Sequence, residues 1–151
     1  MSTIHVPEGF SYVAASLVST VFLLQYQAHL VSTHRKLSGI QYPRLYAEKA
    51  EMEANPAAHI FNCVQRAHQN TLENLAQNYM MTLVLGLTRP KLAAAALGSW
   101  VVQRIFYTRG YASGNPKNRN SAFGIPFYAF GMLTLIFGSA YSAYELVAAG
   151  I

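Results

Sequence analysis

Charged side chains are scarce in this sequence. Only 11% of its 151 residues are Asp, Glu, Lys or Arg, whereas soluble domains contain about 25%. Apolar residues make up 52%, and the mean hydropathy is +0.19. A domain of this length has a large surface for its volume, which soluble proteins cover mainly with charged residues. The composition therefore argues against a soluble globule and favours one domain, residues 1–151, that crosses a membrane several times.

Cysteine and long basic runs are also lacking. The single cysteine, Cys63, excludes an intrachain disulfide framework. It lies five residues before His68, a spacing that does not share a helix face well, so we expect an inert thiol rather than a nucleophile. The net charge is +5, but no basic run is long enough for nucleic-acid binding. No nucleic acid is therefore expected as a partner.

Two long uncharged stretches, residues 9–34 and 120–144, qualify as membrane spans, because about 20 mostly apolar residues suffice to cross a bilayer. Two middle stretches are shorter. The first of them is long enough to cross a membrane only if its helix includes the polar residues 61–73. The second is long enough only if its helix includes Arg104 and Tyr107. The sequence thus predicts an all-α, integral membrane four-helix bundle with spans over residues 10–32, 61–88, 91–111 and 121–146.

Lys and Arg are distributed unevenly over the loops of this predicted bundle. The first and third loops carry Arg35, Lys36, Arg44, Lys49, Arg109, Lys117 and Arg119. The opposite side carries only Arg89 and Lys91. Because positive charge is retained in the cytoplasm, loops one and three are predicted to be cytosolic, and both termini to lie outside or in a lumen.

Glycine recurs every seven residues in the last span, at Gly124, Gly131 and Gly138. This spacing keeps the three glycines on one helix face, where they allow another backbone to approach closely. The face is therefore predicted to pack against another helix of the bundle, although membrane helices are also rich in glycine in general.

Polar residues form two stripes at helical spacing. One consists of Arg66, Asn70, Glu73 and Gln77, and the other of Arg104, Tyr107 and Tyr111. Arg66 and Glu73 are about 10 Å apart along a helix axis, which we interpret as too far for a direct ion pair. Each would then need a partner from another helix, another subunit or a ligand.

The charges at membrane depth are two arginines and one glutamate, a set that a ligand with one amine and two carboxylates would complete. Charged groups in a membrane are costly and usually mark a site. The alternative is that Arg66 and Arg104 extend to the interface while Glu73 bonds a neighbouring helix.

Two motifs make the chain recognisable. The segment FNC-x-QRAHQNTLE at 61–73 and the downstream R-x-x-Y-x-x-G-Y at 104–111 resemble the second and third helices of the MAPEG superfamily, the membrane-associated proteins of eicosanoid and glutathione metabolism. The QYP at 41–43 is similar to its first loop. The resemblance is closest to the type 3 microsomal glutathione S-transferases.

This resemblance implies a homotrimer in an intracellular membrane, the endoplasmic reticulum in particular, with glutathione as co-substrate between subunits near the cytosolic side. No metal is implied. The positions that match glutathione-binding residues of the family are Arg35 or Lys36, Arg66, His68, Asn70, Glu73, Arg104, Tyr107 and Tyr111. Arg66, Asn70 and Glu73 would hold the γ-glutamyl end, and Arg35 or Lys36 the glycyl carboxylate. His68 is expected to be a hydrogen-bonding contact rather than a general base.

The chain departs from the family pattern at two positions. Leukotriene-forming members have a tyrosine after the glutamate, where this chain has Asn74, which favours the detoxifying branch. The arginine that activates the thiol aligns with Asn118, flanked by Lys117 and Arg119. We expect Arg119 to be the catalytic cation, with Lys117 or Arg104 as alternatives, because a nearby cation stabilises a thiolate.

Three functions follow from these features. The first is a glutathione transferase and peroxidase that acts on lipophilic electrophiles and lipid hydroperoxides drawn from membrane lipid. The second is a non-catalytic lipid-binding scaffold that resembles the lipoxygenase-activating protein of the same superfamily. The third is a small channel or transporter subunit, whose charged residues would line a pore. Dependence on glutathione separates the first from the other two.

Overall fold

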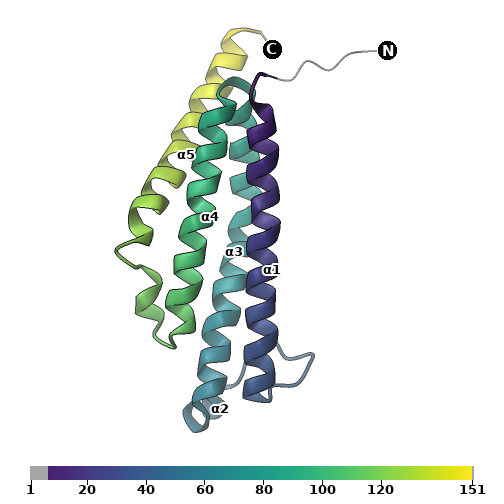
Figure 1. The fold of residues 1–151 in the computed structure, drawn as a ribbon, viewed down its shortest axis with the longest axis vertical. Coiled ribbons are helices and arrows are strands. Elements are labelled where there is room, and N and C mark those ends of the chain that lie inside the picture. Colours follow the sequence, from purple (N-terminus) through teal and green to yellow (C-terminus); the bar gives the residue numbers. More distant parts are fainter. Residues whose placement is uncertain (1–6, 151) are drawn as a thin grey trace.

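The computed structural model of the chain describes residues 7–150, and each regular element in that range is a helix. The helices are α1 (Phe10–Ser38), α2 (Lys49–Ala54), α3 (Pro56–Thr88), α4 (Pro90–Ala112), the 3-10 helix η1 (Pro116–Arg119) and α5 (Gly124–Ala148). The four long helices run side by side along the molecule (Figure 1). The all-α prediction is confirmed. Residues 1–6 and 151 of the predicted domain lie outside the described range.

Local sequence explains where α3 begins and ends. The Asn55 side chain accepts a hydrogen bond from the Ala57 amide, and Pro56 occupies the first helical position, where its missing N–H leaves no bond unmade. At the other end a single residue, Arg89, separates α3 from α4, which again starts on a proline. The polar segment 61–73 therefore belongs to the same helix as the apolar residues that follow it.

The helix α3 is longer than a membrane is thick. It contains 33 residues, or about 50 Å, against roughly 30 Å of hydrocarbon. Together with α1 it extends beyond α4 at the end that carries α2 (Figure 1).

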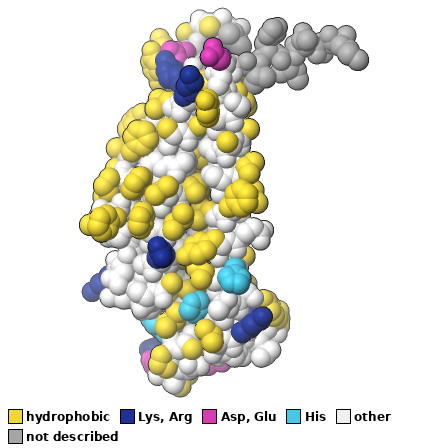
Figure 2. Space-filling view, viewed as in Figure 1, with side chains coloured by type: hydrophobic (Ala, Val, Ile, Leu, Met, Phe, Trp, Pro, Cys, Tyr) yellow, Lys and Arg dark blue, Asp and Glu magenta, His cyan; other side chains and the backbone are white. Residues whose placement is uncertain are grey.

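The outer surfaces of α1 and α5 are apolar. By length and composition these two helices, among the described residues, are suited to cross a membrane. Only 28% of the most apolar stretch of α1 and 17% of that of α5 is buried inside the chain, so most of their apolar side chains face outwards. Figure 2 shows a broad hydrophobic zone between charged side chains at one end and the basic and histidine side chains towards the other.

The glycine face of α5 packs as predicted. A Cβ atom at Gly131 would lie 2.9 Å from the carbonyl oxygen of Ala96 in α4, and one at Gly138 would lie 3.1 Å from the side chain of Leu85 in α3. Small buried residues on the other side of this contact, such as Ala93 and Ala96, let the helices approach closely. The heptad spacing of glycine thus reports a real helix–helix contact.

Candidate functional site

The charged residues of the α3 stripe pair with each other. An Arg66 guanidinium nitrogen lies 2.8 Å from Oε1 of Glu73, and both side chains are 44% exposed. Asn70 donates to the other carboxylate oxygen at 3.5 Å. The prediction that Arg66 and Glu73 are too far apart is therefore wrong. Seven residues make two turns, so both side chains leave the same face, and their combined length bridges the axial separation.

Arg104 is the buried cation of the site. It is only 4% exposed, and it donates from Nε to the Thr71 hydroxyl at 3.0 Å and from a terminal nitrogen to Oδ1 of Asn70 at 2.8 Å. The guanidinium lies over the Tyr107 ring, 3.8 Å from its centre. None of the ion pairs formed by the described residues includes Arg104. A buried charge without a counter-ion is costly, so this position favours an anionic ligand.

A buried glutamine from α1 supports this arrangement. Gln27 is fully buried, and its amide nitrogen donates to the hydroxyls of Thr71 at 2.9 Å and Thr108 at 2.7 Å. Its oxygen lies 3.3 Å from Nδ1 of His68. The sequence predicts that His68 contacts the ligand. In the structure the His68 side chain contacts Gln27 of α1. Sequence reasoning missed Gln27, although a glutamine in the uncharged first span was a usable signal.

Three tyrosines, Tyr46, Tyr107 and Tyr111, lie in the region of Arg66 and Arg104. The rings of Tyr107 and Tyr111 meet edge to face with centres 5.1 Å apart. From loop one, the Tyr46 hydroxyl donates to Oε1 of Gln69 in α3. Burial raises the pKa of the Tyr46 phenol, and the nearby Arg66 opposes that rise. Tyr46 lies in an irregular loop, where no periodicity could have predicted it.

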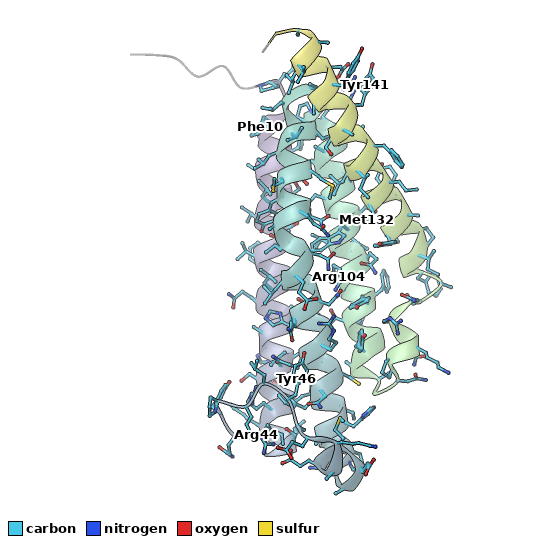
Figure 3. All side chains as sticks on the ribbon, turned by 180° about the vertical axis from the view of Figure 1, so that it is seen from behind. Phe10, Arg44, Tyr46, Arg104, Met132 and Tyr141 are labelled. Carbon is cyan, nitrogen blue, oxygen red and sulfur yellow. The ribbon has the colours of Figure 1, made fainter. Side chains whose placement is uncertain are left out.

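A cavity of about 340 Å³ opens between α3, α4, η1 and α5. It brings together four predicted site residues, Asn70, Arg104, Tyr107 and Arg119. Its remaining lining consists of Asn74, Trp100, Gln103, Asn120, Gly124, Ile125, Tyr128 and Met132. Figure 3 shows Arg104 of α4 and Met132 of α5 on facing helices. The other predicted site residues do not line this cavity. They are Arg35, Lys36, Arg66, His68, Glu73 and Tyr111.

The three candidates for the activating cation occupy different surroundings. Arg119 lines the cavity and donates to the Pro116 carbonyl at 2.8 Å. Lys117 and Asn118 are exposed, and the Asn118 amide is turned to the Ser113 hydroxyl. This position of η1 requires Gly110 in α4, because a Cβ there would clash with the Asn118 carbonyl and lie 2.8 Å from the Arg119 amide nitrogen.

The two basic residues at the end of α1 also differ. Arg35 is 6% exposed and donates to the carbonyl of Arg44 at 2.7 Å. Its guanidinium lies between the rings of Tyr42 and Phe61, at 4.4 and 4.6 Å from their centres. Arg35 thereby anchors loop one, whereas Lys36 is exposed. Of the two, Lys36 is the one whose charge faces outwards.

Cys63 is buried on α3. Its sulfur lies 3.8 Å from Nε2 of His59, one turn earlier, rather than near His68. The same histidine nitrogen lies 2.8 Å from the Gly114 carbonyl, which favours a protonated Nε2 that cannot act as a base towards the thiol.

Sequence comparison relates the chain to one protein family. The model of the MAPEG family matches residues 13–139, from the start of α1 into α5, and so includes every element that lines the cavity. The chain belongs to the MAPEG family. Its members are membrane proteins and include glutathione transferases. The superfamily predicted from the two motifs is thus confirmed, and the outward-facing apolar side chains of α1 and α5 are explained by lipid contact.

Proposed function

We propose that this MAPEG protein is a membrane-bound glutathione S-transferase of the type 3 kind, with glutathione peroxidase activity. The observation that carries the proposal is Arg104, a buried cation without a carboxylate partner among the described residues, in a cavity that also receives Arg119. Glutathione is an anion with a thiol, so it brings net negative charge to the surroundings of Arg104 and a group that a cation can activate.

The charges suggest how glutathione binds. Its γ-glutamyl end carries an ammonium and a carboxylate, which match the carboxylate of Glu73 and the guanidinium of Arg66. The existing Arg66–Glu73 pair is half-exposed, so both groups are available to exchange partners at low desolvation cost. Lys36 is the better candidate for the glycyl carboxylate, because the Arg35 guanidinium is already bonded within loop one.

The chemistry requires a thiolate at neutral pH. A cysteine thiol has a pKa near 8.5, and a cation within a few ångströms favours the thiolate. We assign this role to Arg119, because its side chain lines the cavity. The thiolate then attacks an electrophilic carbon and displaces its leaving group, or attacks the terminal oxygen of a hydroperoxide.

In this proposal the four long helices form a membrane-spanning bundle with loops one and three in the cytosol, and three copies assemble with glutathione between them. An endoplasmic reticulum location suits this orientation. The length of α3 supports the topology: a helix of 33 residues that has Thr88 at one membrane surface would have its polar stripe near the other, on the side that carries the basic loops. Lipophilic electrophiles and lipid hydroperoxides would enter from the surrounding lipid.

One experiment tests the proposal. Purified protein is mixed with glutathione, and the ultraviolet absorbance of the thiolate is followed, then the turnover of an aryl chloride and of a lipid hydroperoxide. We expect thiolate to form at pH 7 and both substrates to react. A protein that binds lipid but shows neither thiolate formation nor glutathione-dependent turnover would instead be a scaffold like the lipoxygenase-activating protein.

A further inference from the structure

The hydroxyl of Thr71 on α3 is bonded in three directions inside the bundle. The residue is fully buried, and the hydroxyl donates to the carbonyl of Ala67 at 3.0 Å. It accepts from the amide nitrogen of Gln27 at 2.9 Å and from Nε of Arg104 at 3.0 Å. A hydroxyl has one proton and two lone pairs, so these bonds use its whole capacity. The Thr71 hydroxyl therefore cannot turn elsewhere without losing a buried hydrogen bond.

The direction of the Gln27 amide follows from its neighbours. The hydroxyls of Thr71 and Thr108 each give their proton to a carbonyl four residues earlier in their own helix. Both therefore present a lone pair to Gln27, so its NH2 group faces them and its oxygen faces Nδ1 of His68. Gln27 thereby ties α1 to α3 and α4 and holds the Thr71 hydroxyl in place.

Thr71 holds one side of the Arg104 guanidinium. Nε donates to Thr71 and Nη2 donates to Asn70, while the ring of Tyr107 lies against the guanidinium face. The third nitrogen, Nη1, forms no hydrogen bond to the described residues, yet it is not one of their buried unpaired atoms, so part of its surface is accessible. Because Arg104 lines the cavity, Nη1 is the nitrogen left for an anion there.

We propose that Thr71 is a positioning residue, which holds Nε of Arg104 against α3 so that Nη1 is presented to the anionic co-substrate. A guanidinium carries five N–H donors on a long side chain, and without a fixed partner it would present different nitrogens to the cavity. An arginine that is already held loses less conformational freedom when the ligand binds. The inference rests on the proposed binding of glutathione beside Arg104.

The first measurement needs no glutathione. Protein labelled with ¹⁵N-arginine is purified in detergent, and the exchange of each arginine Nε–H with water is followed by NMR. The signal that disappears in Arg104→Lys belongs to Arg104. We expect this signal to exchange slowly in the wild type and in Thr71→Ser, which keeps the hydroxyl. In Thr71→Val, which replaces the hydroxyl with a methyl group, exchange should be at least about tenfold faster, because one buried hydrogen bond is lost.

Thr108→Val is the matched control. It makes the same change and also removes one bond to Gln27, but the Thr108 hydroxyl bonds to the backbone carbonyl of Arg104 and not to its guanidinium. The Arg104 signal should stay slow in this variant.

Calorimetry with glutathione is the second measurement. We expect the affinity to fall about tenfold in Thr71→Val and to keep its wild-type value in Thr71→Ser and Thr108→Val. A hydroxyl that only stabilised the bundle would make the two valine variants alike, because each loses one bond to the same glutamine.

Fast exchange of the Arg104 signal in the wild type would overturn the proposal without any variant. Equal effects of Thr71→Val and Thr108→Val on exchange would also overturn it, as would wild-type glutathione affinity in folded Thr71→Val. Failure of the proposed function is separate. A wild type that binds no glutathione, but whose slow Arg104 signal depends on the Thr71 hydroxyl, would refute the glutathione site and still support Thr71 as the residue that positions Arg104.

Discussion

At the scale of single residues, the position of Arg119 leads to a sharp prediction. It lines the cavity, whereas Lys117, two residues earlier, is exposed. We expect Arg119→Ala to leave the dissociation constant of glutathione within about twofold but to lower turnover at pH 7, because the thiol pKa rises back towards about 8.5. The pH profile of kcat, and thiolate absorbance against pH, measure this shift to higher pH.

Lys117→Ala is the matched control for that experiment, since it removes a neighbouring positive charge that does not line the cavity. It should leave both the pH profile and the turnover unchanged. Full turnover in Arg119→Ala, together with a loss in Arg104→Ala, would instead place the thiolate deeper, against the buried guanidinium of α4.

The Arg66–Glu73 pair gives a second residue-scale prediction. We expect Arg66→Ala and Glu73→Gln each to weaken glutathione binding about tenfold, or about 1.4 kcal/mol, because both side chains are half-exposed and water screens part of their interaction. Isothermal calorimetry measures the effect. Arg44→Ala serves as the control, because it breaks another exposed Arg–Glu pair, with Glu51, in loop one. Unchanged affinity in both α3 variants would refute the assignment of the γ-glutamyl end.

At the scale of the elements, the close contact between α4 and η1 depends on Gly110, which has no side chain. A methyl group at Gly110 would overlap the backbone of Asn118 and Arg119, so Gly110→Ala should displace η1 and move Arg119 away from the cavity. We expect turnover to fall while most of the glutathione affinity remains, since Arg66, Asn70 and Glu73 lie on α3.

Gly98→Ala is the control within the same helix, because a Cβ at that position meets no atom within 4 Å. It should keep wild-type turnover, and the alanine should even favour the helix slightly. Circular dichroism of both variants monitors the helix content. Wild-type turnover in Gly110→Ala would show that η1 does not position the activating cation.

At the scale of the whole molecule, the proposed trimer leads to a prediction about assembly. The Arg66–Glu73 pair remains 44% exposed on the single chain, and a neighbouring subunit would enclose it together with glutathione. Detergents that dissociate the oligomer should therefore abolish glutathione binding while the helix content stays constant. Light scattering gives the mass, and calorimetry of the same samples gives the affinity. A monomer that still binds glutathione would contradict sites between subunits.

Much of the architecture was predictable from the sequence, because its signals are local. Charge-free stretches and helical spacing depend on neighbours along the chain. They predicted an all-helical protein, the continuation of one helix through residues 61–73 and the glycine face of α5. The family was also recognisable, since residues 61–73 and 104–111 keep its polar positions at fixed spacing.

Contacts between side chains from distant segments were decided only by the tertiary structure. The helical rise per residue suggested that Arg66 and Glu73 are too far apart to form an ion pair. Their long side chains leave the same face of α3, however, and they meet. No spacing could show that Gln27 satisfies its amide while Gln103 does not, or that Arg119 lines the cavity. The reason is physical: helix formation depends on local backbone geometry, whereas pairing and burial depend on which helices pack together and how far each side chain extends.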